Sequence, residues 1–527
     1  MASLTPAPSR VDEDPAAPLV RPGSGHDAQV SAPDPTSERA PLEGRGLAII
    51  AGAMAVAGAL GAWGLGRKSL WVDEAISLGA THELVATWKG TGATMALYYA
   101  LLRAWSIPSA DPAWLRSMSV ACTVVAVPFA WSAACRAFDR RVAALAVGAM
   151  ALLPLVSRYA QEARSYALVL LLTSISWCAL VASARADDAG DERARRRWWG
   201  VFCAASLLAP LAHGLAALQL LGQVAFVAAA PDRRRCLDRF KVVGIGVVAV
   251  TAGLVALGAS DVASWIPPLS LAQARELVDT LTTPALVPQL VLLAAIALGT
   301  WTCIVRARSA ATPTERWFAL LPIAWGLVPP ALLVVASIAR PYLLARYVMA
   351  SAPGLALLLA LAVLGTGPAP HRIRSLAVAI PIVAALVVGQ VHLHQERGDD
   401  WRAAAEVVRA DAKGTDVLVL PNPSVRSAFD AAWAEVASAD ATVPTALSPV
   451  EPVGQVRRFY TVHAPDVLAS DVAADGAARV WLVDQAGAGF PGALDPFLEY
   501  DAIAGRFVVA DDQTFSGGVR VVLLERR

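Results

Sequence analysis

Residues 47–65, LAIIAGAMAVAGALGAWGL, form an apolar run without a charged side chain, and this run decides the fold. As a helix it would rise about 28 Å, close to the ~30 Å hydrocarbon thickness of a bilayer. About 45 residues rich in proline, serine and acidic side chains precede it, whereas a secretory signal begins with a basic and then a short apolar stretch. The run therefore predicts a retained first membrane span.

Ten more apolar runs follow, separated by short connections. Hydrophobic residues make up 56% of the 527 residues and charged residues 17%, against about 25% charged in soluble proteins. The predicted fold class is an all-α polytopic membrane bundle of about eleven transmembrane helices. The ten further runs are residues 115–135, 142–157, 165–184, 198–214, 215–230, 242–259, 286–304, 317–338, 346–365 and 375–392.

Arginine clusters occur in every second connection, from Arg136 in the first to Arg372 in the last. Cytoplasmic loops carry the excess of basic residues, so these connections are predicted to be cytoplasmic. The alternation requires residues 198–230 to form two short spans that turn near His213. The sequence thus predicts a multi-pass protein of the cell membrane with a cytoplasmic N-terminus and an extracytoplasmic C-terminal region.

Three regions are predicted: a disordered cytoplasmic tail at 1–45, a transmembrane domain at 46–395 with a first outer loop at 67–114, and a small extracytoplasmic α/β domain at 396–527. The last region contains a helical pattern over 400–410 and four short β-type runs. These runs are residues 416–420, 479–484, 506–510 and 519–524.

Several function classes receive no support from the composition. The formal net charge of +1 gives no field that would steer nucleic acid, so no nucleic-acid partner is expected. The six cysteines show neither a disulfide framework nor a CxxC metal spacing. No glycine-rich phosphate loop precedes a helix, which disfavours a nucleotide substrate.

Ionisable residues gather near the predicted extracytoplasmic ends of the spans. A single polar residue at a helix end often extends its side chain to the membrane interface and has no further role. Basic residues, however, are ordinarily depleted on the extracytoplasmic side. A set of arginines on that side therefore implies anionic partners or an anionic ligand. The set comprises Asp73, Glu74, Arg103, Arg116, Arg158, Glu162, Arg164, His213, Asp261, Arg340 and Arg346.

The acidic pair Asp73-Glu74 follows the first span within Trp71-Val72-Asp73-Glu74. Neighbouring carboxylates point in different directions on a helix or a strand, so we expect one of them to act alone as a base. The alternative is an acidic pair placed at a helix N-terminus for the macrodipole. Arg164 and Arg346 open their spans at helix N-termini, where an arginine has the wrong sign for the dipole, so both are predicted to hold an anion such as phosphate.

Seven motifs in order resemble the type C glycosyltransferases, specifically the bacterial family 39-like membrane sugar transferases related to protein O-mannosyltransferases. They are WVDEA at 71, LYY at 97, LRSMSV at 115, QEARSYAL at 161, His-Gly at 213, RPYLLARYVMASAPG at 340 and DDWRAAAEVV at 399. The resemblance covers residues 67–180 and 340–410. Many relatives carry His-Pro-Pro before Leu-Tyr-Tyr, whereas this sequence has Thr94-Met95-Ala96.

The resemblance implies a hexosyl- or pentosyltransferase that moves a sugar from a polyprenyl-phosphate carrier to an acceptor hydroxyl with inversion on the outer face. The richness of the sequence in alanine and arginine favours mannose or arabinose as that sugar. The acceptor would be a glycan, a lipid or a protein of the cell envelope. The resemblance implies no cofactor, and a divalent metal is not indicated. It implies Asp73 as the catalytic base and Arg346 and Arg164 as ligands of the donor phosphate. Six further residues are candidates for contact with the sugar or for orienting the residues that touch it: Glu74, Tyr99, Arg116, Glu162, Tyr166 and His213.

A transporter or flippase of a lipid-linked glycan is the alternative. Transporters usually carry a polar site near the bilayer midplane between related halves. Here the polar residues lie at one end of the predicted spans and no internal repeat is evident, which favours an enzyme.

Overall fold

The computed structural model describes residues 44–91, 94–257, 266–366, 372–422, 425–438, 441–448, 464–486 and 492–527. Almost all of the predicted tail at 1–45 lies outside these ranges, as does Asp261. Residues 39–527 form one compact unit, so the helices and the sheet can be described together. The boundary predicted at 395 and 396 stays a prediction.

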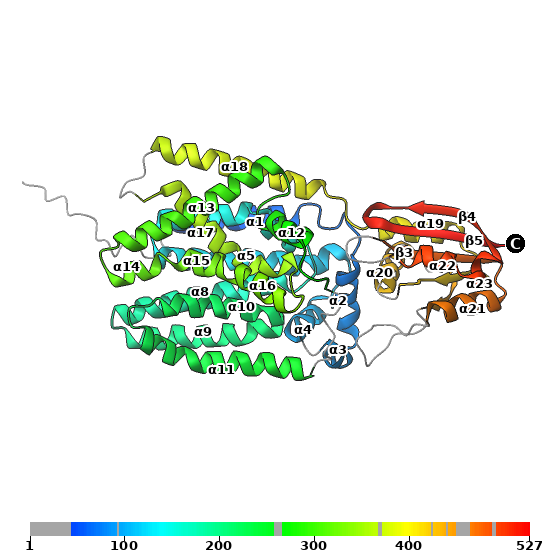
Figure 1. The fold of residues 1–527 in the computed structure, drawn as a ribbon, viewed down its shortest axis with the longest axis horizontal. Coiled ribbons are helices and arrows are strands. Elements are labelled where there is room, and N and C mark those ends of the chain that lie inside the picture. The colour runs from blue at the N-terminus through cyan, green and yellow to red at the C-terminus, as the bar shows by residue number, and fades with distance from the viewer. Residues whose placement is uncertain are drawn as a thin grey trace, which may run out of the picture. The chain divides into compact units, whose positions relative to one another are not determined.

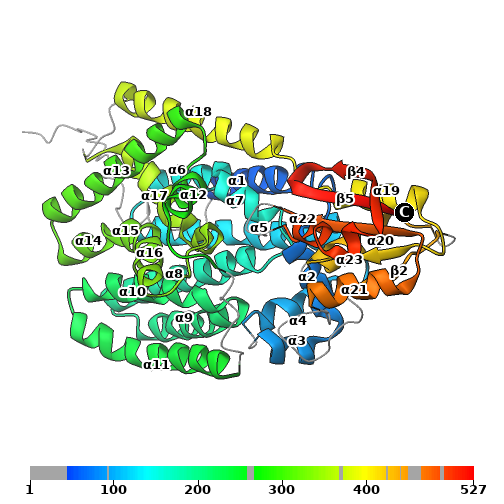
Figure 2. The same cartoon turned by 45° about the vertical axis from the view of Figure 1, so that its right-hand side comes forward.

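Long helices account for the first part of the chain (Figure 1). Both views show α8, α9 and α11 side by side (Figures 1 and 2), in agreement with their packing contacts. The helices are α1 Arg45–Ala62, α5 Pro112–Ala137, α6 Arg140–Leu152, α7 Pro154–Ala160, α8 Tyr166–Asp188, α9 Glu192–Ala212, α10 Ala217–Ala228, α11 Arg233–Leu257, α12 Leu271–Leu281, α13 Leu286–Ser309, α14 Pro313–Phe318, α15 Leu321–Gly326, α16 Val328–Ala339, α17 Ala352–Leu364 and α18 Arg372–Gln395, with the 3-10 turns η2 Gly214–Ala216 and η3 Ala345–Ser351.

Helices coincide with all eleven predicted spans. Six of the helices in the described ranges are long and apolar enough to cross a bilayer, and two bent pairs raise the number to eight. The other three predicted crossings coincide with α9, α10 and α11, which do not meet the same test of length and hydropathy. The fold class of a helical polytopic membrane bundle is confirmed, while the count of eleven and the orientation stay predictions.

Two predicted spans are broken rather than continuous. The run at 142–157 becomes α6 and α7, which meet at a 54° bend. Leu153 at this bend is extended (φ −63°, ψ 123°), because the ring of Pro154 disfavours a helical conformation in the preceding residue. The run at 317–338 is likewise divided among α14, α15 and α16, with a 47° bend before α16.

Helix α17 lies at the centre of the bundle, with all but the last of its residues buried. Its backbone approaches two neighbours so closely that only glycine fits at the contacts. A Cβ at Gly354 would lie 2.2 Å from the nitrogen of Gly326 on α15, and a Cβ at Gly299 on α13 would lie 2.1 Å from the carbonyl oxygen of Leu358. Small residues at helix crossings permit this close packing in a membrane bundle.

The predicted first outer loop folds into three short helices, α2 Val72–His82, α3 Leu84–Thr91 and α4 Ala96–Trp105. Helix α4 would rise only about 15 Å, too little for a crossing. Leu70, Val72 and Ala75 of this segment are buried in one apolar cluster with Trp401 and Phe429 of the C-terminal region. Ser69 Oγ also accepts a hydrogen bond from the backbone N–H of Arg402 at 3.0 Å.

The C-terminal region is a mixed five-stranded sheet of order β2-β1-β3-β5-β4. Strand β1 pairs in parallel with β2 and β3, whereas β5 is antiparallel to β3 and β4. The four predicted strands are present, and only the short β2 was missed. The strands are β1 Val417–Val419, β2 Thr445–Ser448, β3 Arg479–Gln485, β4 Phe507–Thr514 and β5 Val519–Arg526, and the helices are α19 Trp401–Asp411, α20 Arg426–Val436, α21 Pro465–Asp475, α22 Leu494–Leu498 and α23 Asp501–Ala504, with the turn η5 Ser516–Gly518.

Candidate active site

Asp73 lies between two arginines from distant parts of the chain. It is the second residue of α2, and its Oδ2 is 3.3 Å from Nη1 of Arg346 and 3.5 Å from Nη2 of Arg164. The carboxylate side chain is 20% exposed, whereas those of Arg164 and Arg346 are 7% and 16% exposed. The three residues to which the sequence assigned the base and the phosphate contacts therefore meet in one partly accessible cluster.

Arg164 is bound to the main chain of α2. It lies in the connection between α7 and α8, and its Nη1 donates to the carbonyl oxygen of Asp73 at 2.9 Å and to Ser77 Oγ at 2.8 Å. Ser77 Oγ donates in turn to the same carbonyl oxygen at 2.8 Å. These contacts hold Arg164 in place independently of the carboxylate of Asp73.

Arg346 has a different setting. It lies in η3, and its guanidinium carbon is 5.5 Å from the centre of the Trp71 ring, within range of a cation–π contact. Arg346 also lines a cavity, and Arg164 does not. The two arginines that pair with Asp73 are thus not equivalent, because only Arg346 reaches the cavity.

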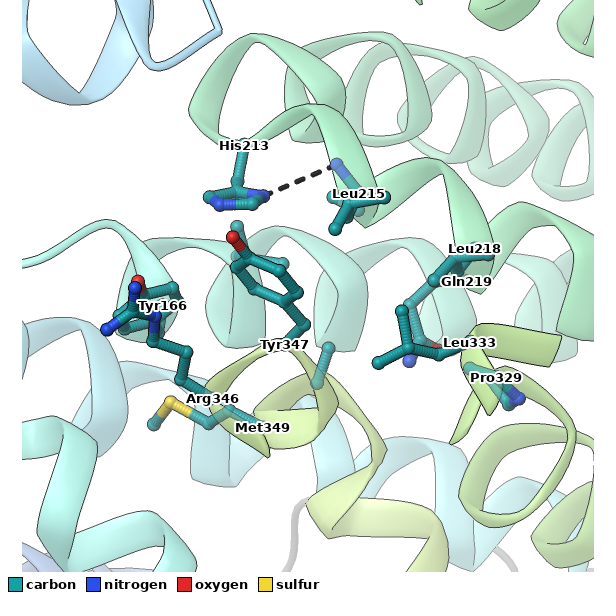
Figure 3. A pocket seen from close by; sticks show the side chains of 13 residues that line it. Tyr166, His213, Leu215, Leu218, Gln219, Pro329, Leu333, Arg346, Tyr347 and Met349 are labelled. Atoms are coloured by element: carbon teal, nitrogen blue, oxygen red, sulfur yellow. Dashed lines mark hydrogen bonds between the residues drawn. The ribbon is translucent and has the colours of Figure 1, made fainter. Parts of the chain in front are cut away.

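The cavity lies between α8, α10, α16 and η3 and is narrow, with a volume of about 20 Å³. Figure 3 shows Arg346 and Tyr166 on one side of Tyr347, and Leu333 and Pro329 on the other. His213 lies close to Tyr347, with ring centres 4.8 Å apart, and its Nδ1 accepts the N–H of Leu215 at 3.3 Å. The cavity is therefore amphipathic, with a cationic and aromatic end and an apolar end.

Glu74 points away from this cluster and is fully buried. Its carboxylate accepts from Arg116 Nε at 2.9 Å and from Nη2 at 2.6 Å, and from the backbone N–H of Ala163 at 2.7 Å. Arg116 also donates to the carbonyl oxygens of Leu65, Lys68 and Ser69. This pair joins α2 and α5 to the connection between α1 and α2 and to the connection between α7 and α8 that carries Arg164.

Glu162 and Tyr99 complete the predicted set. Glu162 lies in the connection between α7 and α8. Burial and the neighbouring Glu74 raise the pKa of its carboxyl group to about 7. Within the described part of the chain its Oε2 is buried without a hydrogen-bond partner. Tyr99 is buried on α4, and burial raises its pKa while the nearby Arg164 guanidinium opposes that rise.

Other members of the outward polar set lie elsewhere. Arg103 donates to the carbonyl oxygen of Thr81 at 3.2 Å, and Arg158 pairs with Glu396 at the end of α18. Arg340 lies over the Tyr342 ring at 5.8 Å. No group of three or more potential metal ligands occurs among the residues that the structure describes.

Four residues at the site were not singled out as site residues from the sequence. Trp71 lies two residues before Asp73 and Tyr347 directly follows Arg346, so proximity alone could have suggested them. Gln219 is a polar residue within the apolar α10, which is a recognisable signal in a membrane helix. Nothing in the sequence distinguishes Ser77, because its role depends on where Arg164 lies.

The helical arrangement is similar to that of two membrane proteins of known structure, ArnT and the oligosaccharyltransferase AglB. ArnT from Cupriavidus metallidurans bound to undecaprenyl phosphate is similar with a TM-score of 0.56 and 14% identity, over 90% of this chain and 97% of that chain. AglB from Archaeoglobus fulgidus, an archaeal oligosaccharyltransferase in complex with an inhibitory peptide and a dolichol-phosphate, is similar with a TM-score of 0.53 and 10% identity. The match covers 83% of this chain and 69% of that chain. The Archaeoglobus fulgidus oligosaccharyltransferase in complex with zinc and sulfate is similar with a TM-score of 0.53 and 12% identity. The match covers 83% of this chain and 68% of that chain. At these identities the likeness shows the fold.

No family model matches this sequence, and no curated protein sequence matches it.

Proposed function

We propose that this protein is a membrane glycosyltransferase that moves a sugar from a polyprenyl-phosphate carrier to an acceptor hydroxyl, with Asp73 as the base. The observation that carries the proposal is the position of Asp73 Oδ2 between Arg164 and Arg346 beside an amphipathic cavity. The fold similarity to ArnT and AglB, whose structures hold undecaprenyl phosphate and dolichol-phosphate, supports it.

The cavity fits the chemistry of a prenyl phosphate. Arg346 at its cationic end would bind the phosphate through charge-assisted hydrogen bonds, with Tyr166 and His213 nearby for the sugar. Leu215, Leu218 and Leu333 supply apolar surface for the first isoprene units. A soluble sugar nucleotide would leave this apolar end unused.

The reaction would proceed by in-line displacement. The carboxylate of Asp73 accepts the proton of the acceptor hydroxyl as its oxygen attacks the anomeric carbon. The bond between that carbon and the phosphate oxygen breaks, and the electron pair leaves with polyprenyl phosphate, whose added negative charge Arg346 stabilises.

Inversion places the base and the leaving group on opposite faces of the sugar. Asp73 and the phosphate therefore cannot share Arg346 during the reaction, so donor binding would transfer Arg346 from the carboxylate to the phosphate. Arg164 keeps its contacts with the Asp73 carbonyl oxygen and Ser77, which suits it to orient Asp73. Glu74 and Arg116 would position the same segment from behind.

The finer assignments are part of the proposal. The sugar would be mannose or arabinose, the acceptor a glycan, lipid or protein, and the site extracytoplasmic, as the arginine distribution predicts. The α/β region at 396–527 would present the acceptor, and the packing of its α20 against α2, which carries Asp73, supports this role.

The test uses purified wild-type protein and Asp73→Asn, reconstituted in membranes with radiolabelled polyprenyl-phosphate mannose or arabinose and a cell-envelope extract. Wild type should move label from the carrier to the extract, and Asp73→Asn should be slower by about 100-fold or more, the usual contribution of a positioned base. Asp111→Asn is the matched control: Asp111 lies in the same loop and caps α5, and asparagine caps a helix equally well.

Undiminished transfer by a folded Asp73→Asn would refute the assignment of the base. If wild type moved intact carrier across the vesicle bilayer and formed no new glycosidic bond, the transporter alternative would replace the proposal.

A further inference from the structure

A second cavity lies at the opposite end of α8 from the candidate active site. Helix α8 begins at Tyr166 in the first cavity, and its last turn carries Asp187 and Asp188 at the second. Its 23 residues span about 34 Å. The second cavity is open to the surface and has a volume of about 190 Å³. It lies between α8, α9, α14 and the connection from α10 to α11.

The inner wall of this cavity is apolar and held in place by aromatic packing. Trp317 stacks on Phe226 with ring centres 4.8 Å apart, and its Nε1 donates to the Phe226 carbonyl oxygen at 2.7 Å. Phe226 in turn packs edge-on against Trp177 at 5.9 Å. Trp199, Phe240 and Leu180 supply further apolar lining. The wall is therefore part of the bundle core and does not depend on mobile surface side chains.

The acidic groups at the rim already have partners within the protein. Asp187 is 3.5 Å from Arg195 and 3.2 Å from Arg239. Asp188 accepts the hydroxyl of Thr314 at 3.1 Å. Asp232 accepts the backbone N–H of Arg235 at 3.3 Å.

The guanidinium of Arg235 differs from these groups. It lines the cavity, its residue is exposed, and the structure gives its side chain no partner among the residues it describes. Arg235 lies in the first turn of α11, which begins at Arg233. The rim therefore offers an available cation next to an apolar wall.

The position of the cavity along the helices selects the ligand. The last turn of α8, a candidate membrane span, ends at the rim, so the rim lies at the depth of lipid headgroups, where tryptophans such as Trp199 and Trp317 are common. Beyond Arg239, Val242 and Ile245 of α11 are 74% and 70% exposed, and they offer an apolar surface to a chain that leaves the cavity.

We propose that this cavity binds one anionic glycerophospholipid, with its phosphate on Arg235 and the start of its acyl chains against the aromatic wall. A free phosphate or a nucleotide would match Arg235 but not the apolar wall. The predicted topology assigns this end of the bundle to the cytoplasmic leaflet, whose surface carries the anionic lipids. The proposal does not depend on the glycosyltransferase reaction.

The test is native mass spectrometry of the full-length protein after addition of phosphatidylglycerol or of phosphatidylcholine with the same acyl chains. Wild type should retain one phosphatidylglycerol in preference to phosphatidylcholine. Arg235→Gln should weaken retention about fivefold, the contribution of one arginine near a membrane surface. Arg234→Gln is the matched control, because Arg234 is the exposed neighbour that does not line the cavity. Ala184→Trp, which fills the cavity from α8, should abolish retention.

Three results would overturn the proposal. Equal loss in Arg234→Gln and Arg235→Gln would show diffuse attraction to a basic surface. Equal retention of the two lipids would remove the role of the anion, and full displacement by millimolar inorganic phosphate would identify a soluble anion site. Because transfer of sugar is not measured, failure here leaves the proposed function untouched.

Discussion

Replacing each member of the acidic pair by its amide should separate structure from chemistry. Glu74→Gln should destabilise the protein strongly, whereas Asp73→Asn should fold normally and lose activity. The two residues are adjacent in the sequence, but Glu74 has no exposed side-chain surface and Asp73 is 20% exposed.

The magnitude follows from the contacts. The carboxylate of Glu74 accepts four hydrogen bonds, two from Arg116 and one each from the backbone N–H groups of Ala163 and Trp71. An amide at this position turns one acceptor into a donor that faces these donors, and it leaves the Arg116 charge buried without its partner. Breaking a buried ion pair in this way costs about 3–5 kcal/mol.

Asp73→Asn removes much less. Arg164 keeps the Asp73 carbonyl oxygen and Ser77 as acceptors, and the amide oxygen of asparagine can still accept from Arg346. The expected cost is about 1 kcal/mol, the contribution of one net hydrogen bond.

Thermal unfolding in detergent and sugar transfer, measured on the same preparations, provide the assay. Glu74→Gln should have the lowest unfolding midpoint, and Asp73→Asn should unfold close to wild type while transferring sugar about 100-fold more slowly or worse. Adding Arg116→Met to Glu74→Gln should cost less than the sum of the single changes, because the uncompensated charge is then absent. A Glu74→Gln protein that unfolds like wild type, or an additive double variant, would refute this reasoning.

Three further predictions concern the donor, the pH dependence and the C-terminal region. Arg346→Gln should weaken binding of radiolabelled polyprenyl phosphate by about tenfold, because one charge-assisted hydrogen bond is lost. Arg346→Lys should recover part of this binding. Equal binding by wild type and both variants would contradict the assignment of Arg346 to the phosphate. The pKa of Glu162 is raised from 4.5 to about 7, so folding takes up a proton between these values and the unfolding midpoint should fall as pH rises from about 5 to 7. Glu162→Gln should flatten that dependence, and an unchanged slope would argue against it. Phe429→Ala should lower the free energy of unfolding by about 3–5 kcal/mol, because this buried ring packs in the cluster with Leu70 and Val72. Val443 is exposed, so Val443→Ala should leave the free energy of unfolding unchanged in the same measurement.

The helices and most of the strands could be predicted because their signals are local. Runs of apolar residues long enough to cross a bilayer mark the helices wherever they occur, and short continuous apolar runs mark β3 and β5. Strand β2 was missed because its four residues, Thr445–Ser448, are mostly unburied and carry no alternation. The bend at Pro154 was missed because hydropathy averages over a window and does not detect a change in backbone direction.

The candidate site was predictable only as a set of residue types at one end of the spans. Charged groups beside membrane helices are costly, so their presence draws attention to a function. Their partners are not local: Asp73 meets Arg164, 91 positions away in the sequence, and Glu74 meets Arg116 across 42 positions. From the sequence, Glu74 and Arg116 could be offered only as candidates for substrate contact or for orienting the residues that touch substrate. The structure adds that they bind each other and the backbone.

The sequence by itself determined that this protein is a membrane bundle with a C-terminal α/β region and that Asp73, Arg164 and Arg346 are candidates for its chemistry. Hydropathy and charge are properties of single residues, and they can be read without coordinates. Only the tertiary structure decided which acid is buried and which is accessible, and which arginine reaches the cavity. These distinctions depend on how helices from distant parts of the chain pack together, because packing sets the burial and the partners of each charge.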